Sequence, residues 1–260
     1  MFNQLLKKMA PAAVMALGLS LSACNVNMSI NGDEGVPLAE LDQSGDAPTG
    51  VALLGPDTVI ITEGDTLGIT VEGKSEAVEA MRFTLEGGTL AVMRDSDIWD
   101  GDDKATVRVT MPAPEDLNMA GSGRIEAMTM ASQANINIAG SGTIEVSAIS
   151  SEDLEVAMAG SGKVKVSGTA NSLEVAVMGS GETDLAGLKV ETAEVSIAGS
   201  GSVSLASDGK VEANIAGSGN VNVSGSATCE VNSMGSGKVT CKSPAAKSEP
   251  EATSGDGQAE

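Results

Sequence analysis

The sequence contains no histidine and no tyrosine, and only one tryptophan and two phenylalanines among its 260 residues. Without histidine there is no imidazole base, so neither a Ser/His/Asp nor a Cys/His catalytic set can be assembled. Three cysteines and no histidine cannot supply a zinc-hydrolase site, and so few aromatic rings leave no platform for stacking sugars or bases. These absences argue against an enzyme and against a small-molecule substrate. A carboxylate-based carbohydrate-active enzyme built on a β-helix is the remote alternative.

Basic residues are scarce as well. The chain has 15 Lys and Arg against 36 Asp and Glu, which gives a formal net charge of −21. So strong an acidic excess argues against nucleic acids and anionic lipid surfaces as partners, because both would be repelled. It favours cations or basic surfaces.

What the sequence has in abundance is a repeat. The tripeptide Gly-Ser-Gly occurs seven times in the second half of the chain, at spacings of 18 to 20 residues. Such regular self-similarity is the signature of a repeat architecture in which neighbouring units share a core. The first glycines of the seven copies are Gly121, Gly140, Gly160, Gly179, Gly199, Gly217 and Gly235.

Each copy is flanked by alternating apolar residues. They stand two, four and six positions before the first glycine, as in Ile138, Ile136 and Ala134, and four and six positions after it, as in Ile144 and Val146. A period of two predicts strands with one buried face. Each repeat is therefore expected to be two short strands joined at a Gly-Ser-Gly corner, with connectors of five to seven residues that carry the length variation.

These repeats predict an all-β fold, a single-stranded parallel β-helix (β-solenoid) of about seven coils with a right-handed winding. Glycine suits the corners because a sharp bend needs φ angles that other residues adopt only with strain. A phosphate-cradling glycine loop is the alternative interpretation, but no helix-forming run follows any copy and none carries the required lysine.

The N-terminus has the pattern of a secretory signal. Lys7 and Lys8 precede an apolar run at residues 10–21, and the following residues up to Cys24 resemble a bacterial lipobox, in which the cysteine is lipidated and becomes the new N-terminus. The alternative is an ordinary cleavable signal with an incidental cysteine. By resemblance to sorted lipoproteins, Asn25 after the cysteine implies the outer membrane. Loss of residues 1–23 leaves 13 basic and 36 acidic residues, a net charge of −23.

The chain is thus expected to divide into five parts: a signal peptide at 1–23, an acidic tether at 24–50, an N-terminal β region at 51–111, the solenoid at 112–242 and a disordered tail at 243–260. Within 51–111, strand-like stretches occur at 58–62 with 67–71, at 81–94 and at 105–111. This region forms either additional coils or a separate capping sheet.

The repeat register also places an acidic ladder on the outer surface, five residues before each first glycine. One hypothesis is that the ladder binds divalent cations such as Ca²⁺, which prefer hard oxygen ligands. The alternative is a solvated acidic face that maintains solubility and discourages aggregation. Two positions further on, four asparagines form a partial amide column. The ladder positions are Asp116, Asn135, Glu155, Glu174, Glu194, Glu212 and Glu230, and the amides are Asn118, Asn137, Asn214 and Asn232.

A second acidic cluster, residues 95–103, only superficially resembles a calcium-binding loop. An EF-hand loop has acids at positions 1, 3 and 5 and glycine at 6, whereas here the third acid and the glycine each come one place late. A polar loop between two strands is the expected structure.

Cys229 and Cys241 lie six residues before and six after the last corner, at inward positions on the two walls of the final coil. In an oxidising envelope compartment they are expected to form a disulfide that staples this end of the core. Two small buried thiols are the alternative.

The run at 59–65, followed by 67–72, 87–92 and 107–112 and leading into the corner at 120–123, resembles the head GIN domain family of putative auto-transporter adhesins. The resemblance covers about residues 51 to 242. It implies a secreted or lipid-anchored envelope protein and carries over no catalytic residues.

Two non-enzymatic functions follow. In the first, the lipid holds the rod at the envelope and its repetitive walls bind a cell-surface polymer or another protein, as an adhesin would. In the second, the rod is a structural or stress-associated scaffold that binds partner proteins.

Overall fold

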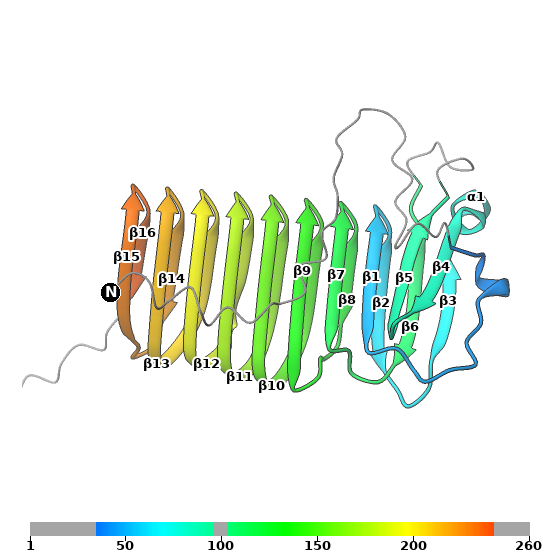
Figure 1. The fold of residues 1–260 in the computed structure, drawn as a ribbon, viewed down its shortest axis with the longest axis horizontal. Helices are drawn as coiled ribbons and strands as arrows, with labels where there is room; N and C mark the ends of the chain where they lie inside the picture. Colours follow the sequence, from blue (N-terminus) through cyan, green and yellow to red (C-terminus); the bar gives the residue numbers. More distant parts are fainter. Residues whose placement is uncertain (1–34, 96–102, 242–260) are drawn as a thin grey trace, which may run out of the picture.

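The computed structural model describes residues 35–95 and 103–241, which form one elongated stack of β-strands (Figure 1). Within these residues, helix is confined to α1 (Ser75–Glu79) and a 3₁₀ turn, η2 (Leu38–Glu40). The predicted all-β parallel solenoid is confirmed, because successive repeats pair in parallel. The predicted signal peptide, the lipidated Cys24 and the tail at 243–260 lie outside the described residues.

The strands build two walls that meet at the Gly-Ser-Gly corners. We call the wall whose strands run into the corners the acidic face, and the wall whose strands leave them the opposite face. On the acidic face β7 (Asp116–Gly121) pairs with β9 (Gln133–Gly140). On the opposite face β8 (Arg124–Ala127) pairs with the start of β10 (Thr143–Gly160). All these pairs are parallel, so equivalent residues of successive coils lie side by side.

Four strands are longer than the sequence predicts. Each starts on the opposite face, runs through the predicted connector and ends on the acidic face, so the expected pair of short strands is wrong for these coils. The connector is strand because its backbone groups pair with those of the neighbouring coil, as between Ser150 and Thr169. The register shifts fall in these connectors, as between Val146 and Ile149. The four strands are β10 (Thr143–Gly160), β11 (Lys163–Gly179), β12 (Glu182–Gly199) and β13 (Ser202–Gly217).

The region before the repeats adds two parallel layers to the stack. β1 (Gly50–Gly55) and β2 (Thr58–Glu63) pair with β7 and β8. On their other edges, β1 and β2 pair with β5 (Thr89–Arg94) and β6 (Thr106–Met111). The layer of β1 and β2, which comes first in the sequence, therefore lies between two layers formed by later residues. Of the two structures predicted for this region, additional coils are present.

The N-terminal end of the stack is also capped. β3 (Gly68–Glu72) lies antiparallel to β6, and β4 (Met81–Glu86) lies antiparallel to β5. Phe83 of β4 is 1% exposed and Met81 is 2% exposed, so the cap covers the end of the core.

Residues 36–41, expected to belong to the tether, pack against the cap instead. Val36 exchanges backbone hydrogen bonds of 2.9 and 2.8 Å with Phe83, and Leu38 and Leu41 pack against the main core. The tether expectation is wrong here because these apolar side chains gain from leaving water.

The core is built from columns of aliphatic side chains. The position four residues before the first glycine is fully buried in six successive coils, and burying one such valine or isoleucine contributes about 1.5–3 kcal/mol. The six residues are Leu117, Ile136, Val156, Val175, Val195 and Ala213.

One hydroxyl interrupts the apolar columns of the opposite face. Thr183 is 1% exposed and lies in register with Val164 and Val203. Its Oγ1 finds no hydrogen-bond partner among the described residues. A buried polar group of this kind costs stability.

A buried ion pair secures the N-terminal layers. Arg94 at the end of β5 donates from Nε to Asp57 Oδ2 at 2.5 Å, and the two side chains are 5% and 1% exposed. Asp57 also accepts the backbone N–H of Ala105 at 2.7 Å. Asp57 therefore ties the start of β2 to the end of β5 and to the residue before β6.

The seven corner glycines all have φ between +124° and +131°, a region that favours glycine. At Gly160, an added Cβ would meet the carbonyl group of Gly140 in the preceding coil, with the carbonyl carbon at 3.1 Å. Here both the backbone angle and the close approach of the coils require glycine.

At the C-terminal end, β14 (Asn220–Ser224) pairs with β16 (Lys238–Cys241), and β13 pairs with β15 (Thr228–Gly235). Unlike the N-terminal end, this end has no capping strand among the described residues. Val231 of β15 is accordingly 47% exposed.

Candidate functional site

The acidic face presents three outward columns that run along the rod. The column next to the corners consists of alanine and methionine, and we call it the alanine–methionine column. Met178 is 67% and Met234 is 81% exposed. No lysine or arginine occurs in it, so it forms an apolar ridge. Its members are Ala120, Ala139, Ala159, Met178, Ala198, Ala216 and Met234.

Beside this ridge runs the amide column predicted from the sequence. Asn137 Nδ2 donates to Asn118 Oδ1 at 3.0 Å, and Asn232 Nδ2 donates to Asn214 Oδ1 at 3.1 Å. Between the two pairs the column is filled by small residues, Ala157, Ala176 and Ser196. The amides thus bond along the rod in neighbouring coils.

The third column is the acidic ladder, and the structure places its members in register. Asp116 lies opposite Asn135, which lies opposite Glu155, and Glu174 follows. The remaining three, Glu194, Glu212 and Glu230, continue the row. Asn135 Nδ2 donates to Asp116 Oδ1 at 3.0 Å, which relieves the charge at one end.

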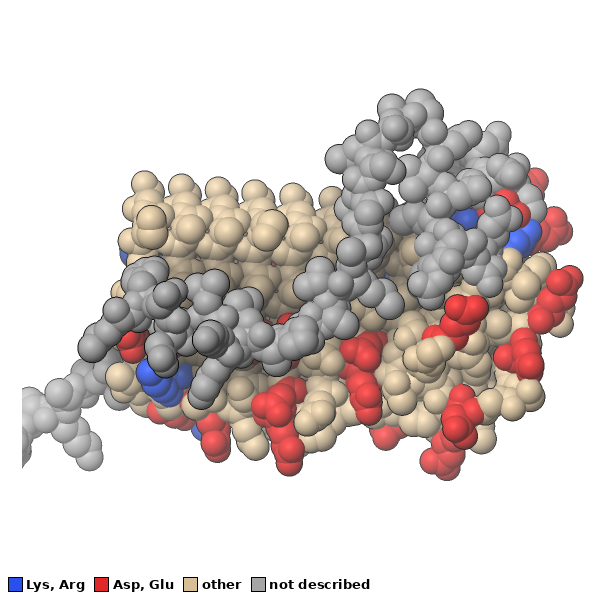
Figure 2. Space-filling model, in the orientation of Figure 1, with Lys and Arg blue, Asp and Glu red and all other residues tan. Residues whose placement is uncertain are grey.

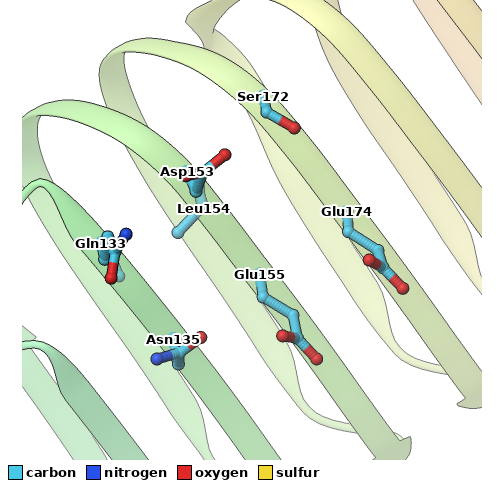
Figure 3. Close-up of a pocket in the computed structure, with 8 residues that line it drawn as sticks. Gln133, Asn135, Asp153, Leu154, Glu155, Ser172 and Glu174 are labelled. Carbon is cyan, nitrogen blue, oxygen red and sulfur yellow. The ribbon is translucent and has the colours of Figure 1, made fainter. Parts of the chain in front are cut away.

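A shallow hollow of about 260 Å³ lies across the ladder. Figure 3 shows the carboxylates of Glu155 and Glu174 pointing the same way from adjacent coils, with Asn135 beside them. The hollow is also lined by Gln133 and Asp153. Its lining is polar, and its shape is that of a surface groove open to solvent.

Within residues 35–95 and 103–241 no three acidic or cysteine side chains come close enough to hold a metal ion. The ladder supplies one carboxylate per coil in a single row, whereas Ca²⁺ takes six to eight oxygen ligands. The calcium hypothesis stays a prediction from the sequence.

The opposite face differs in carrying both signs of charge. Arg124 donates to Glu126 at 2.5 Å and to Glu145 on the next coil at 2.6 Å. The hydrogen bond to Glu126 and the charge of Glu145 raise the pKa of Arg124. Lys163 similarly bonds Glu182 at 3.0 Å. These ion pairs neutralise the opposite face locally.

On the side of the coil formed by the connectors, Lys189 and Asp208 of adjacent coils lie 2.8 Å apart. The hydrogen bond from Lys189 lowers the pKa of Asp208. Here too a basic group neutralises an acidic one. On the acidic face the ladder member Glu230 has such a partner in Lys210, at 3.6 Å, and most of the unbalanced acidic charge of the repeats lies on this face.

Figure 2 shows the result at the surface. In the left part of the view the upper edge of the rod, where the corners lie, is an uncharged row of regular knobs, and acidic side chains gather below it. The charged side chains of the repeats are therefore kept away from the corners.

Two further predicted features can be located. The structure joins Cys229 and Cys241 by a disulfide with a Cα–Cα distance of 6.5 Å. Of the acidic cluster at 95–103, residues 96–102 lie outside the described residues. Its ends are held by ion pairs of 2.9 Å, Asp95 with Arg82 and Asp103 with Lys74.

Sequence reasoning did not find the Arg94–Asp57 pair, nor a second, small apolar cluster on the outer side of β1 and β5. That cluster comprises Ala52, Leu54, Ala91 and Met93, with Ala120 packed against it. Leu54 pairs with Ala120 in the register, so the cluster continues the alanine–methionine column. Aligning Gly55 with the corner glycines would have revealed it.

No helix in the described parts of the chain is long and apolar enough to cross a membrane. No curated protein matches the chain.

Solved structures share the fold. A putative adhesin from Bacteroides fragilis is 19% identical with a TM-score of 0.70, and the alignment covers 75% of this chain and 92% of that one. A putative lipid binding protein from Parabacteroides distasonis is 24% identical with a TM-score of 0.60 and the same coverage. A putative adhesin from Parabacteroides merdae is 17% identical with a TM-score of 0.54, covering 75% and 91%. At these identities the likeness concerns the fold alone.

The sequence model of one protein family matches residues 47–227, more than two thirds of the chain, and the family is described as "Putative auto-transporter adhesin, head GIN domain". The match spans the two N-terminal layers and six of the seven Gly-Ser-Gly corners. The chain belongs to the head GIN domain family of putative auto-transporter adhesins.

Proposed function

We propose that this protein is a non-enzymatic, lipid-anchored binding module of the bacterial cell envelope, and that its acidic face binds an extended, uncharged or positively charged polymer. The observation that carries the proposal is the acidic face itself, in which an apolar, an amide-rich and an acidic column repeat in register. Membership of an adhesin-like family supports a location at the cell envelope or surface. The outer membrane and the lipid on Cys24 are part of the proposal.

A polymer is the ligand class that this surface suits. Successive coils repeat at about 4.8 Å, so a chain lying along the rod meets the same groups again and again. Each contact is weak, but linked contacts add to a useful affinity. The ridge supplies apolar contact, the amides donate and accept hydrogen bonds, and the carboxylates repel anionic polymers.

The experiment compares two triple variants of the mature chain with equal net charge. One places lysines on the alanine–methionine column (Ala159→Lys, Met178→Lys, Ala198→Lys). The matched control places them on the outer side of the opposite face (Thr143→Lys, Ser202→Lys, Ser204→Lys). Binding is measured by co-sedimentation with whole cells and with purified envelope polysaccharide. Loss of binding only in the first variant supports the proposal, and equal binding by both contradicts it.

Orientation is tested separately by adding protease to intact cells. Cleavage of the protein, with a periplasmic marker intact, is expected for a surface binder. Protection of the protein would favour the second function, a structural scaffold inside the envelope, for which the uncapped C-terminal coil offers a docking edge.

A further inference from the structure

The two ends of the rod are finished differently. At the N-terminal end, antiparallel strands cover the core and leave Phe83 and Met81 at 1% and 2% exposure. At the other end, β15 pairs only with β13, and β16 only with β14, among the described strands. Figure 1 shows β15 and β16 as the last strands of the stack. One edge of each, with its backbone N–H and C=O groups, is open for a further strand.

The open end also exposes core positions. Val231 belongs to the column whose six other members, from Leu117 to Ala213, are 0% exposed, yet it is itself 47% exposed. Cys229, Val239 and Cys241 are only partly buried. In the inner coils this surface is covered by the next coil, whereas in the last coil no further coil of the described residues covers it.

The segment that follows β16 is unsuited to cover this end. Residues 242–260 contain two prolines and no valine, isoleucine, leucine, methionine or aromatic residue. Such a segment has neither the apolar side chains to fill a core position nor the composition of a strand.

We propose that the open end is a self-association surface, on which a second copy of this chain docks end to end through β15. Head-to-tail stacking would set Val231 against the capped end, which exposes no large apolar side chain among the described residues. We therefore take the contact to be two-fold symmetric, which closes it at a dimer. With the two-fold axis normal to the walls, the two open ends form an antiparallel β15–β15 pair in the acidic face.

The side chains favour the register centred on Val231 over the one centred on Glu230. Inward residues must oppose inward residues, so the two-fold axis passes through a residue of β15. An axis at Glu230 would oppose two carboxylates, which is destabilising. An axis at Val231 instead packs the exposed Val231 against its own copy and sets Glu230 opposite the partner's Asn232.

The proposal does not rest on polymer binding. It has a consequence for the envelope, because Val36 pairs with β4 at the capped end. The first described residues of the two copies would therefore lie at opposite ends of a doubled rod.

The test is sedimentation equilibrium of the mature chain up to about 100 µM, a concentration at which a weak specific dimer is populated. Asn232→Lys and Asn232→Glu both lose the hydrogen bond to Asn214 and set opposite charges against the partner's Glu230, which in its own chain lies 3.6 Å from Lys210. The lysine variant is expected to dimerise at least about tenfold more tightly than the glutamate variant, because the contact occurs twice.

Asn137→Lys and Asn137→Glu are the matched controls. Asn137 donates the equivalent hydrogen bond to Asn118 far from the open end, and the net charge changes equally. These two variants are expected to dimerise alike. A chain that is monomeric throughout the concentration range overturns the proposal, and so does a difference between the Asn137 variants as large as that between the Asn232 variants.

Discussion

Replacing Gly160 by alanine should destabilise the solenoid by about 2 kcal/mol, because two costs act together. Gly160 has a φ of +128°, and holding a non-glycine residue in such a conformation costs about 1–3 kcal/mol. The new Cβ would also meet the carbonyl group of Gly140. Since that contact is with backbone, the coils must move apart at the corner.

Moving the two coils apart weakens the backbone hydrogen bonds between them. Ser161 N–H donates to Gly140 C=O at 2.9 Å, and Lys163 N–H donates to Gly142 C=O at 2.9 Å. Lengthening one of them costs about 1 kcal/mol. Alanine restricts the unfolded chain and returns up to about 1 kcal/mol. The sum is about 2 kcal/mol.

The assay is urea denaturation followed by far-UV circular dichroism. At a slope of about 3 kcal/mol/M, the midpoint should fall by about 0.7 M. Ser161→Ala is the control at the same corner; its side chain is exposed, and its effect should stay within about 0.5 kcal/mol. If Gly160→Ala changes the midpoint no more than Ser161→Ala does, the assigned corner geometry is wrong.

Three further predictions concern the core, the terminal coil and the ladder. Thr183→Val should stabilise the protein by about 1 kcal/mol, because it removes a buried hydroxyl that lacks a partner among the described residues; a lower melting temperature would contradict this. Mutating both Cys229 and Cys241 to alanine should cost about 2–3 kcal/mol, and hydrogen exchange should speed up in β15 and β16 but not in β11; a change spread evenly over the rod would argue against a local staple. Glu194→Gln should stabilise by about 0.5 kcal/mol at low salt, and less at high salt, by relieving repulsion from Glu174 and Glu212. The same variant tests the calcium hypothesis, since millimolar Ca²⁺ should raise the melting temperature of the parent more than that of the variant only if the ladder binds the metal.

The parallel stack and the outward columns could be predicted because the repeat pattern can be read directly from the local sequence. Alternation around each Gly-Ser-Gly fixes which residues face inward, and the fixed offset aligns Glu155 with Glu174 before any coordinates are known. The period of the apolar residues and the spacing of the repeats are sufficient for this prediction.

The inserted N-terminal layer could not be predicted in the same way. Its corner follows Gly55 with Pro56 and Asp57, so it lacks the tripeptide, although Val51, Leu53, Val59 and Ile61 occupy the apolar positions of the repeat. Its position between two later layers depends on pairings far apart in the sequence, which no local pattern encodes.

Connector and tether expectations failed for a related reason. The connectors become strand only because a neighbouring coil supplies hydrogen-bond partners, as Thr169 does for Ser150. Likewise, Leu38 and Leu41 show no periodicity, and they pack only because the cap offers them a surface. In both cases tertiary context decides the local structure.

The most direct test of the central claim, that equivalent residues of successive coils stack in register, is a distance measurement between spin labels in the alanine–methionine column. Pairs at Ala139 with Ala216, Ala139 with Met234 and Ala120 with Met234 span four, five and six coil steps. Double electron–electron resonance should then give separations that grow by about 4.8 Å per step, from about 19 Å through 24 Å to 29 Å. Separations that fail to grow with the number of coils would contradict the parallel stack, and with it the acidic face and the open end.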